Sequence, residues 1–278
     1  MTVSVADLGA LTRIDGGGPA DPVCFTTVVD PVFTIGPKVH GGALQVVSAH
    51  AAVDAVGRSE MVPVAISSDY LRAPEPRDVD VVATVVKRGR RVCVVDVVVA
   101  QDGRDAVRSV VTLAAPDHGT PRHSGVPDEL AAMPTEPAAD AVPVRGSIVA
   151  DIVHLAAAVD MHYDRSSVPV MAGERGAPET RFWARPADGE TDGFFAILAG
   201  DLSMPVVMNL GVFGWAPTLQ MTTYLRRRPA PGWLRARVTT TEIGQGWFEE
   251  DHLLVDATGA VVAQSRQLAL VPSQEGQA

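Results

Sequence analysis

His40, Gly41 and Gly42 form the step in this sequence that is best suited to bind a polarised carbonyl group. They open an alanine-rich apolar stretch that predicts a helix over Gly41–Val56, with Gly57 as its stop. Backbone N–H groups at a helix start form a positive pocket, and glycines let a ligand approach closely. Each such donor typically contributes roughly 10²–10³ in rate by stabilising an oxyanion. The alternative is that the glycines only allow a tight turn, with His40 structural or solvent-facing.

Polar residues in β-rich or apolar stretches are a second set of candidates. Gln267 lies in a run of small and apolar residues, so its amide could face a polar pocket, with Gln264 on the opposite face. Asp69 could serve as a base, although a solvated carboxylate at a strand end is the simpler interpretation. Asp201 would be costly to bury unpaired, so it is either half-exposed or hydrogen-bonded in a pocket.

Other chemistries find little support in the sequence. It has no G-x-S-x-G motif, which argues against an α/β-hydrolase, and its seven histidines lack the paired spacing of a zinc site. We therefore expect neither a metal nor a cofactor. The net charge of -10 disfavours nucleic acid as a partner. Cys24 and Cys93 lie among apolar β-forming residues and are predicted to be buried free thiols, which suits a reducing cytoplasm.

The sequence predicts no association with a membrane. No apolar run approaches the roughly 20 residues that span a bilayer. The first 18 residues lack the basic-then-apolar order of a secretory signal. A cytoplasmic location is the expectation.

The elements that would position the candidate residues occur twice in the sequence, 154 residues apart, with Tyr70 matching Tyr224. Each copy opens with Tyr-Leu-Arg, continues through β-rich runs separated by glycine-marked turns, and ends at a proline. The predicted strands cover residues 79–86, 91–100 and 105–115 in the first copy and 233–241, 248–255 and 260–270 in the second. A helix is predicted before each set, over 41–56 and over 194–203. Repetition of one supersecondary plan indicates a duplicated domain.

Each copy thus predicts a long antiparallel sheet packed around one central helix, which is an α+β solution. A sheet curled around a helix is a hotdog fold, so two copies predict a double hotdog. The stretch 117–144 is rich in Pro, Asp, Glu, Gly and Ala, as linkers are. We expect an N-terminal hotdog over 1–118, a linker over 119–145 and a C-terminal hotdog over 146–278. Sheet edges and faces left to cover favour a homo-oligomer, with a dimer as the expectation.

Five motifs in this arrangement carry a resemblance to a known family. They are VHGGALQ at 39–45, SSDYLRAP at 67–74, AQDG at 100–103, PTLQMTTYLRRRP at 217–229 and GAVVAQSRQ at 259–267. In their order and duplication, the chain resembles the bacterial acyl-CoA thioesterase II family, particularly the thioesterase-like branch common in actinobacteria. The resemblance covers most of residues 22–272. It implies hydrolysis of a fatty or related acyl-CoA to the free acid and CoA by direct attack of water.

The resemblance also implies a site in the second hotdog, where an Asp, a Thr or Ser and a Gln together orient and activate one water. By this resemblance the Gln falls on Gln267. The hydroxyl falls on Thr241 or its neighbour Thr240, and the Asp position falls on Gln220. The expected catalytic set is therefore Gln220, Thr241 and Gln267.

Gln220 is a departure from the family pattern, because an amide oxygen can accept a hydrogen bond from water but cannot take its proton. The chain is therefore expected to be a slow thioesterase, or to use a carboxylate from outside the trio, such as Asp69 or Asp201. The expected substrate contacts are His40, Gly41, Gly42 and Asp69.

Two other functions stay open at this point. The loss of the family Asp makes a non-catalytic protein that binds acyl-CoA credible. A hotdog enoyl-CoA hydratase or dehydratase would need a positioned acid–base pair such as His with Asp. His40 is present for that role, but the sequence shows no evident partner for it.

Overall fold

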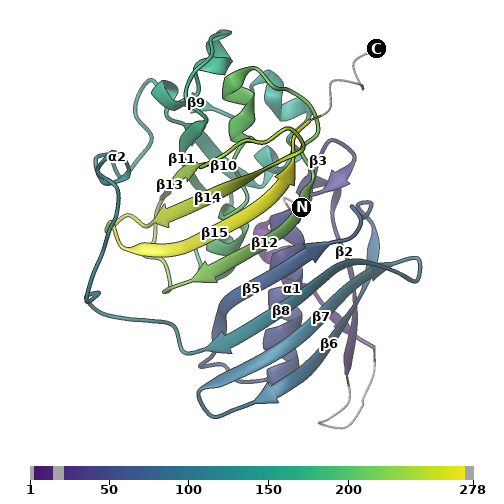
Figure 1. Ribbon diagram of the computed structural model, residues 1–278. Helices are drawn as coiled ribbons and strands as arrows, with labels where there is room; N and C mark the ends of the chain where they lie inside the picture. Colours follow the sequence, from purple (N-terminus) through teal and green to yellow (C-terminus); the bar gives the residue numbers. More distant parts are fainter. Residues whose placement is uncertain (1–2, 15–21, 273–278) are drawn as a thin grey trace.

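The computed structural model describes residues 3–14 and 22–272, and each half of the chain forms an antiparallel sheet that wraps around a helix (Figure 1). The first half contains helix α1 (Gly41–Val56), and the second contains the shorter helix α3 (Gly193–Ala199). The predicted double hotdog of the α+β class is confirmed.

The strands of the first half are β2 (Val23–Val28), β5 (Val62–Tyr70), β6 (Asp78–Arg88), β7 (Val92–Gln101) and β8 (Arg104–Ala114). Those of the second half are β10 (Val159–Tyr163), β11 (Glu179–Pro186), β12 (Thr218–Leu225), β13 (Leu234–Thr239), β14 (Trp247–Val255) and β15 (Val261–Leu270). The two-residue strands β1 (Thr12–Arg13) and β9 (Val142–Pro143) end the sheet, while β3 (Thr34–Ile35) and β4 (Lys38–Val39) form a separate ribbon before α1. All six predicted strands agree with observed ones to within two residues at each end.

The two halves join edge to edge through an antiparallel pair formed by β5 and β12 (Figure 1). This pair makes one continuous 13-stranded sheet in which neither central strand has an open edge. Ser67 pairs with Thr222 and Ser68 pairs with Met221, so positions equivalent in the repeat pair reciprocally across the junction. Such reciprocity is the pattern of a twofold interface, here within one chain.

Gln45 of α1 ties the helix to both central strands. Its amide nitrogen donates to the Ser68 hydroxyl at 3.2 Å and to the Met221 carbonyl at 3.1 Å. Its amide oxygen accepts from the Thr223 hydroxyl at 2.7 Å. Because Gln45 is fully buried, these bonds supply its polar atoms with the partners that water would otherwise provide.

The helices α1 and α3 pack against each other in opposite directions. Gly42, at the start of α1, lies against the Leu198 carbonyl at the end of α3. At the other end of the contact, the His50 ring of α1 stacks on Phe194 of α3, with ring centroids 3.6 Å apart. The start of α1 therefore faces the residues that follow α3.

Helix α3 is shorter than the predicted 194–203, which changes the setting of Asp201. The Asp192 carboxylate accepts the Phe195 N–H at 2.8 Å and caps the start of the helix. At the other end, Gly200 and Asp201 bond to carbonyls three residues earlier, so the last turn tightens and the helix ends at Ala199. Asp201 consequently lies just beyond the helix instead of within it.

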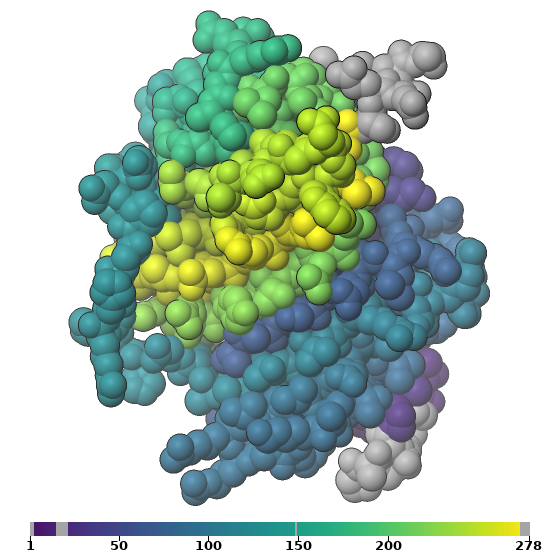
Figure 2. Space-filling view, in the orientation of Figure 1, coloured from purple at the N-terminus to yellow at the C-terminus, as the bar shows by residue number. Residues whose placement is uncertain are grey.

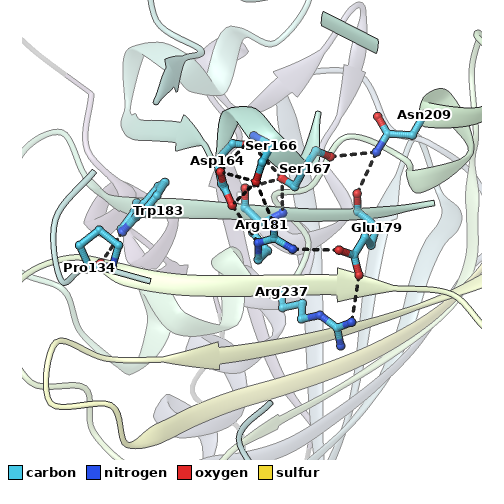
Figure 3. Close-up of polar contacts among 9 residues, drawn as sticks. All are labelled: Pro134, Asp164, Ser166, Ser167, Glu179, Arg181, Trp183, Asn209 and Arg237. Carbon is cyan, nitrogen blue, oxygen red and sulfur yellow. Dashed lines mark hydrogen bonds and ion pairs between the residues drawn. The ribbon is translucent and has the colours of Figure 1, made fainter. Parts of the chain in front are cut away.

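The connector between the halves (residues 115–141) runs along the outside of the molecule (Figure 2). It contains one short helix, α2 (Asp128–Ala131). Leu130 and Met133 are buried there against Trp183 and Trp233 of the second half. The Trp183 indole donates to the Pro134 carbonyl at 2.8 Å (Figure 3). The later part of the predicted linker is thus packed on the second hotdog.

A polar network beside β11 braces the second half (Figure 3). Arg181 forms ion pairs with Asp164 and Glu179, each at 2.8 Å, and Glu179 also pairs with Arg237 at 2.9 Å. The buried side-chain amide of Asn209 donates to three backbone carbonyls at 2.8 to 3.0 Å. Asn209 belongs to the 3₁₀ helix η7 (Val206–Leu210), so the network fixes that segment against β11.

Limited proteolysis under native conditions tests the domain boundaries. Residues 117–125 are exposed throughout and include Arg122, so trypsin should cut first at Arg122. The two fragments should stay associated in size-exclusion chromatography, because the β5–β12 pair does not involve the connector. A first cut within 79–115 would contradict boundaries near residues 118 and 145.

Candidate functional site

The start of α1 and the segment after α3 meet at Asp201. One carboxylate oxygen of Asp201 accepts the Gly42 N–H at 2.6 Å. His40, the N-cap residue of α1, donates from Nε2 to the Asp201 carbonyl oxygen at 2.9 Å, and the same nitrogen lies 3.6 Å from the carboxylate. A negative charge at the positive end of a helix is favourable. The structure thus brings the predicted His40-Gly41-Gly42 step onto a carboxylate from the other half.

The two glycines are needed for this close approach. A Cβ atom on Gly41 would lie 2.9 Å from an Asp201 carboxylate oxygen and 3.2 Å from the Tyr70 hydroxyl. A Cβ atom on Gly42 would lie 3.0 Å from the Leu198 carbonyl. Neither glycine has a positive φ. Close contact with neighbouring side-chain and backbone atoms, not a tight turn, therefore explains the glycine pair.

Tyr70 supports the same step and was not among the predicted site residues. Its hydroxyl donates to the Gly41 carbonyl at 3.0 Å. Burial, together with the charge of Asp201, raises the pKa of Tyr70 well above its usual value, so the hydroxyl stays protonated and acts as a donor. Tyr224, the matching residue of the repeat, is about half exposed and has no such role.

Asp201 has the properties of a general base. Its side chain is only 8% exposed. Burial raises the pKa of Asp201, while His40 and the Gly42 N–H act in the opposite direction. Such a carboxylate binds a proton more readily than a solvated one. Of the two settings expected from the sequence, Asp201 is hydrogen-bonded and not half-exposed.

On the facing strands, Gln267 of β15 takes part in a chain of buried hydrogen bonds. Its amide nitrogen donates to Glu250 of β14 at 2.5 Å. Its amide oxygen accepts from the Thr218 hydroxyl of β12 at 2.7 Å. Gln267 is 8% exposed, so the prediction that it faces inward is confirmed.

Thr218 reaches the inner face because of a β-bulge. Thr218 pairs with Ala269, while Gln220 pairs with the adjacent Leu268, so Leu219 is an extra residue in β12. Without that residue, strand alternation would direct Thr218 outward. Bulges commonly redirect a side chain in this way next to active sites.

Glu250 links the two sides of the site. It is 1% exposed, and its second oxygen accepts the Val206 N–H at 2.6 Å. Burial raises the pKa of Glu250 to about 7, and the charge of Asp201 adds to this rise. The Ser265 hydroxyl of β15 bonds the Gly200 carbonyl, which holds the Asp201 segment against β15. Two buried carboxyl groups therefore lie within electrostatic range of each other.

Two histidines complete the polar cluster. The Nε2 atom of His252 lies 3.0 Å from the Ser203 hydroxyl, and burial lowers the pKa of His252 to about 3, so the ring is neutral. The Nδ1 atoms of His40 and His252 are both buried without a hydrogen-bond partner among the described residues. Orphaned buried polar atoms are rare in folded proteins and call for a ligand or an ordered water.

The predicted trio of Gln220, Thr241 and Gln267 does not assemble, because only Gln267 faces inward. Gln220 is exposed on the outer face, where its amide donates to Asp69 at 3.1 Å, and Asp69 is exposed as well. Thr241 lies in the exposed turn between β13 and β14, where its N–H donates to Glu249.

The hydroxyl that bonds Gln267 is instead that of Thr218, and the buried carboxylate of Asp201 lies within electrostatic range of Glu250, the other partner of Gln267. The sequence contained a signal for Asp201 and for Thr218: Asp201 is the one charge in an apolar stretch, and Thr218 is the second residue of the motif that also contains Gln220. The bulge that separates their faces leaves no mark in the residue pattern.

Neither a metal centre nor the main surface hollow coincides with the polar cluster among the described residues. No group of three or more His, Cys, Asp or Glu side chains among them could hold a metal ion. A hollow of about 510 Å³ lies between the halves elsewhere, lined by residues such as Pro31, Arg145 and His154. Because none of the polar cluster lines that hollow, we place the candidate site by its chemistry and not by cavity size.

Comparison with known proteins places both halves in one group. The acyl-CoA thioesterase N-terminal domain matches residues 28–114, and the acyl-CoA thioesterase C-terminal domain matches residues 127–271. An uncharacterised protein of Mycobacterium tuberculosis is 42% identical over 289 residues, covering 95% of this chain and 97% of that protein.

Solved structures show the same architecture over the whole chain. The crystal structure of a putative thioesterase II from Thermobifida fusca has a TM-score of 0.82 at 28% identity and covers 97% of both chains. A hot dog fold protein from Alicyclobacillus acidocaldarius has a TM-score of 0.77 at 18% identity, covering 98% of this chain and 99% of that one. An acyl-CoA thioesterase II from Mycobacterium marinum gives 0.69 at 16% identity, covering 98% and 100%.

The raised pKa of Glu250 predicts how stability depends on pH. The folded state keeps the proton on Glu250 up to about pH 7, whereas the unfolded chain releases it near 4.5, so the contribution of Glu250 to wild-type stability falls as pH rises between these values. Glu250→Gln removes this loss. The unfolding free energy of the variant minus that of wild type should therefore increase by roughly 2 kcal/mol from pH 5 to pH 8. Urea denaturation at both pH values measures the unfolding free energies of the two proteins. The low pKa of His252 also makes stability depend on pH, but by the same amount in both proteins, so it cancels in their difference. A difference that does not change with pH would contradict the ionisation of Glu250.

Proposed function

The chain belongs to the acyl-CoA thioesterase family, and we propose that it hydrolyses an acyl-CoA by direct attack of one water molecule. The observations that carry this proposal are the buried Asp201 at the start of α1 and its electrostatic link to Glu250, which bonds Gln267 of the Thr218–Gln267 pair. Asp, Thr and Gln are the three residue types that a water-activating site of this family would use.

In this reaction Asp201 is the general base. Water attacks the carbonyl carbon of the thioester while Asp201 takes one of its protons, and the carbon–sulfur bond then breaks to release CoA and the free acid. Thr218 and Gln267 hold the water. The positive end of α1 favours the oxyanion that develops on the carbonyl oxygen through the helix dipole, because the Gly42 N–H is itself bonded to Asp201.

The mechanism makes the rate depend on pH. Asp201 must be ionised to accept a proton, and burial raises the pKa of this carboxyl. The rate should therefore rise with pH through a value above that of an ordinary aspartate. With this carboxylate as the base, an amide at Gln220 is no argument for a non-catalytic protein.

One observation supports a second candidate, an enoyl-CoA hydratase or dehydratase. His40 Nε2 lies 3.6 Å from the Asp201 carboxylate, which is the His–Asp pair that such a reaction needs. The two functions use the same class of ligand but differ in the bond that changes. A hydratase would add water across the double bond of an enoyl-CoA and leave the thioester intact.

A panel of saturated acyl-CoAs and enoyl-CoAs separates the two functions. Release of free thiol from saturated substrates supports the thioesterase. Loss of the enoyl absorbance without thiol release would favour the hydratase, and tight binding without either change would indicate a binding protein.

Within the described residues, no helix has the length and apolar character needed to cross a bilayer. The predicted homo-oligomer stays a prediction, which a native mass measurement would check.

Substitution of the inward-facing residues should abolish most of the activity. Asp201→Asn keeps the shape of the side chain but removes the base, so thiol release should fall roughly 10²- to 10⁴-fold. Gln267→Ala should lower it by roughly one to three orders of magnitude. Steady-state release of CoA at pH 8 measures both effects.

Gln220→Ala provides the matched control, because it removes an amide from the opposite face of the same sheet. Its rate should stay close to that of wild type. A large loss of activity in Gln220→Ala, together with full activity in Asp201→Asn, would contradict this site and indicate one on the outer face of the sheet.

A further inference from the structure

We propose that Glu250 is a positioning residue whose carboxylate sets the direction of the hydrogen bonds through Gln267 to Thr218, and thereby decides how Thr218 presents itself to the attacking water. The inference rests on the proposed function, since it assigns a role to a group beside the proposed water. Glu250 lies on β14 and has a residue type outside the Asp, Thr and Gln set.

The direction of each bond follows from the chemistry of the groups. An ionised carboxylate can only accept hydrogen bonds. The amide end of Gln267 that faces Glu250 at 2.5 Å must therefore be the nitrogen, and the amide oxygen must face Thr218 at 2.7 Å. Because that oxygen can only accept, the Thr218 hydroxyl donates its one hydrogen to Gln267. The remaining valence of the Thr218 oxygen consists of lone pairs.

This arrangement suits the attack of water. A hydroxyl with only lone pairs to offer accepts a hydrogen from the water and so leaves the lone pairs of the water available for the carbonyl carbon. Asp201 can accept the second hydrogen. Both hydrogens of the water are then held by hydrogen bonds, and the lone pairs of its oxygen are left for the carbonyl carbon.

A proton on Glu250 reverses the chain. The protonated carboxyl is a donor toward Gln267, because the Val206 N–H at 2.6 Å already occupies the other oxygen as an acceptor. The Gln267 amide must then present its oxygen to Glu250 and its nitrogen to Thr218. Thr218 accepts from that nitrogen, and its own hydrogen is released toward the water. The Thr218 hydroxyl then donates to the water and occupies the lone pair of the water oxygen that would attack the carbonyl carbon.

The charged and titratable groups around Glu250 come from every element packed against it. Asp201 and Ser203 follow α3, His252 lies two residues along β14, and Tyr163 faces it from β10. The Tyr163 hydroxyl accepts the Met204 N–H at 2.7 Å. Asp201 opposes ionisation of Glu250, whereas the hydrogen bonds from Val206, Gln267 and Ser203 favour it. Near pH 7 both states of Glu250 are populated, which makes the direction of the chain sensitive to pH.

The test is the pH profile of kcat in the full-length wild-type protein and in Glu250→Gln. An amide at position 250 keeps its oxygen on the Val206 N–H, so its nitrogen faces Gln267 and the chain is reversed at every pH. At pH 8, kcat should fall roughly 10- to 100-fold, as misplacement of a reacting group does. The wild-type step near pH 7 should vanish, while the step from Asp201 stays. The double variant Glu250→Gln with Gln267→Glu again offers Thr218 an acceptor, and it should be faster than Glu250→Gln alone.

Glu249→Gln is the matched control, since it makes the same chemical change one residue away on the outer face, where Glu249 accepts the Thr241 N–H. Its kcat and its pH profile should equal those of wild type. Wild-type kcat and an unaltered step in Glu250→Gln would overturn the proposal. If that variant does not fold, a wild-type profile without a step near pH 7 would overturn it equally.

A spectroscopic readout separates this inference from the proposed function. The side-chain nitrogen-15 resonance of Gln267 in labelled wild-type protein should shift between pH 5 and pH 9 with a midpoint near 7. A resonance that stays constant over this range would refute the reversal whether or not the protein hydrolyses thioesters. If no acyl-CoA releases CoA while the resonance does titrate, the proposed function fails and the switch in hydrogen-bond direction stands.

Discussion

The antiparallel pairing of β5 with β12 is the constraint on which the rest of the structure depends. It fixes the two sheets in one register, and with them the two helices that the sheets enclose. Gln45 locks this register from inside, because one buried amide bonds to both strands at once. A slip of one residue would reverse the faces of each strand and leave Gln45 unpaired, at a cost of about 1–3 kcal/mol for the lost bonds alone.

This register brings together groups that neither half holds alone. The first half contributes the positive start of α1, which a carboxylate can approach only because Gly41 and Gly42 lack side chains. The second half contributes that carboxylate, the Thr218–Gln267 pair and the buried Glu250. Burial is a cost for both carboxyl groups, and it raises the pKa of each. The fold tolerates this cost where the first half of the chain meets the second.

The sequence predicted the parts of this structure that depend on local pattern. Helix α1 has the expected bounds, and the six predicted strands agree with observed ones to within two residues at each end. The site was predicted less well, because it depends on geometry that pattern does not record. The resemblance selected Gln220, which faces outward, whereas a single extra residue at Leu219 turns the nearby Thr218 inward. Asp201 was misplaced within a helix because tightening of its last turn depends on tertiary packing.

The repeat has a second position, at the start of α3, that is related to the start of α1 by the internal twofold. There Asp192 caps the helix itself, a methyl carbon of Leu225 would lie 3.0 Å from any Cβ on Gly193, and His50 stacks on Phe194. That position is occupied by the protein's own cap and side chains. In a dimer of identical hotdogs, any substitution that closed one such position would close both. Fusion of the two copies into one gene removes this coupling. The start of α3 can then serve packing alone, while the start of α1 keeps its place in the candidate site.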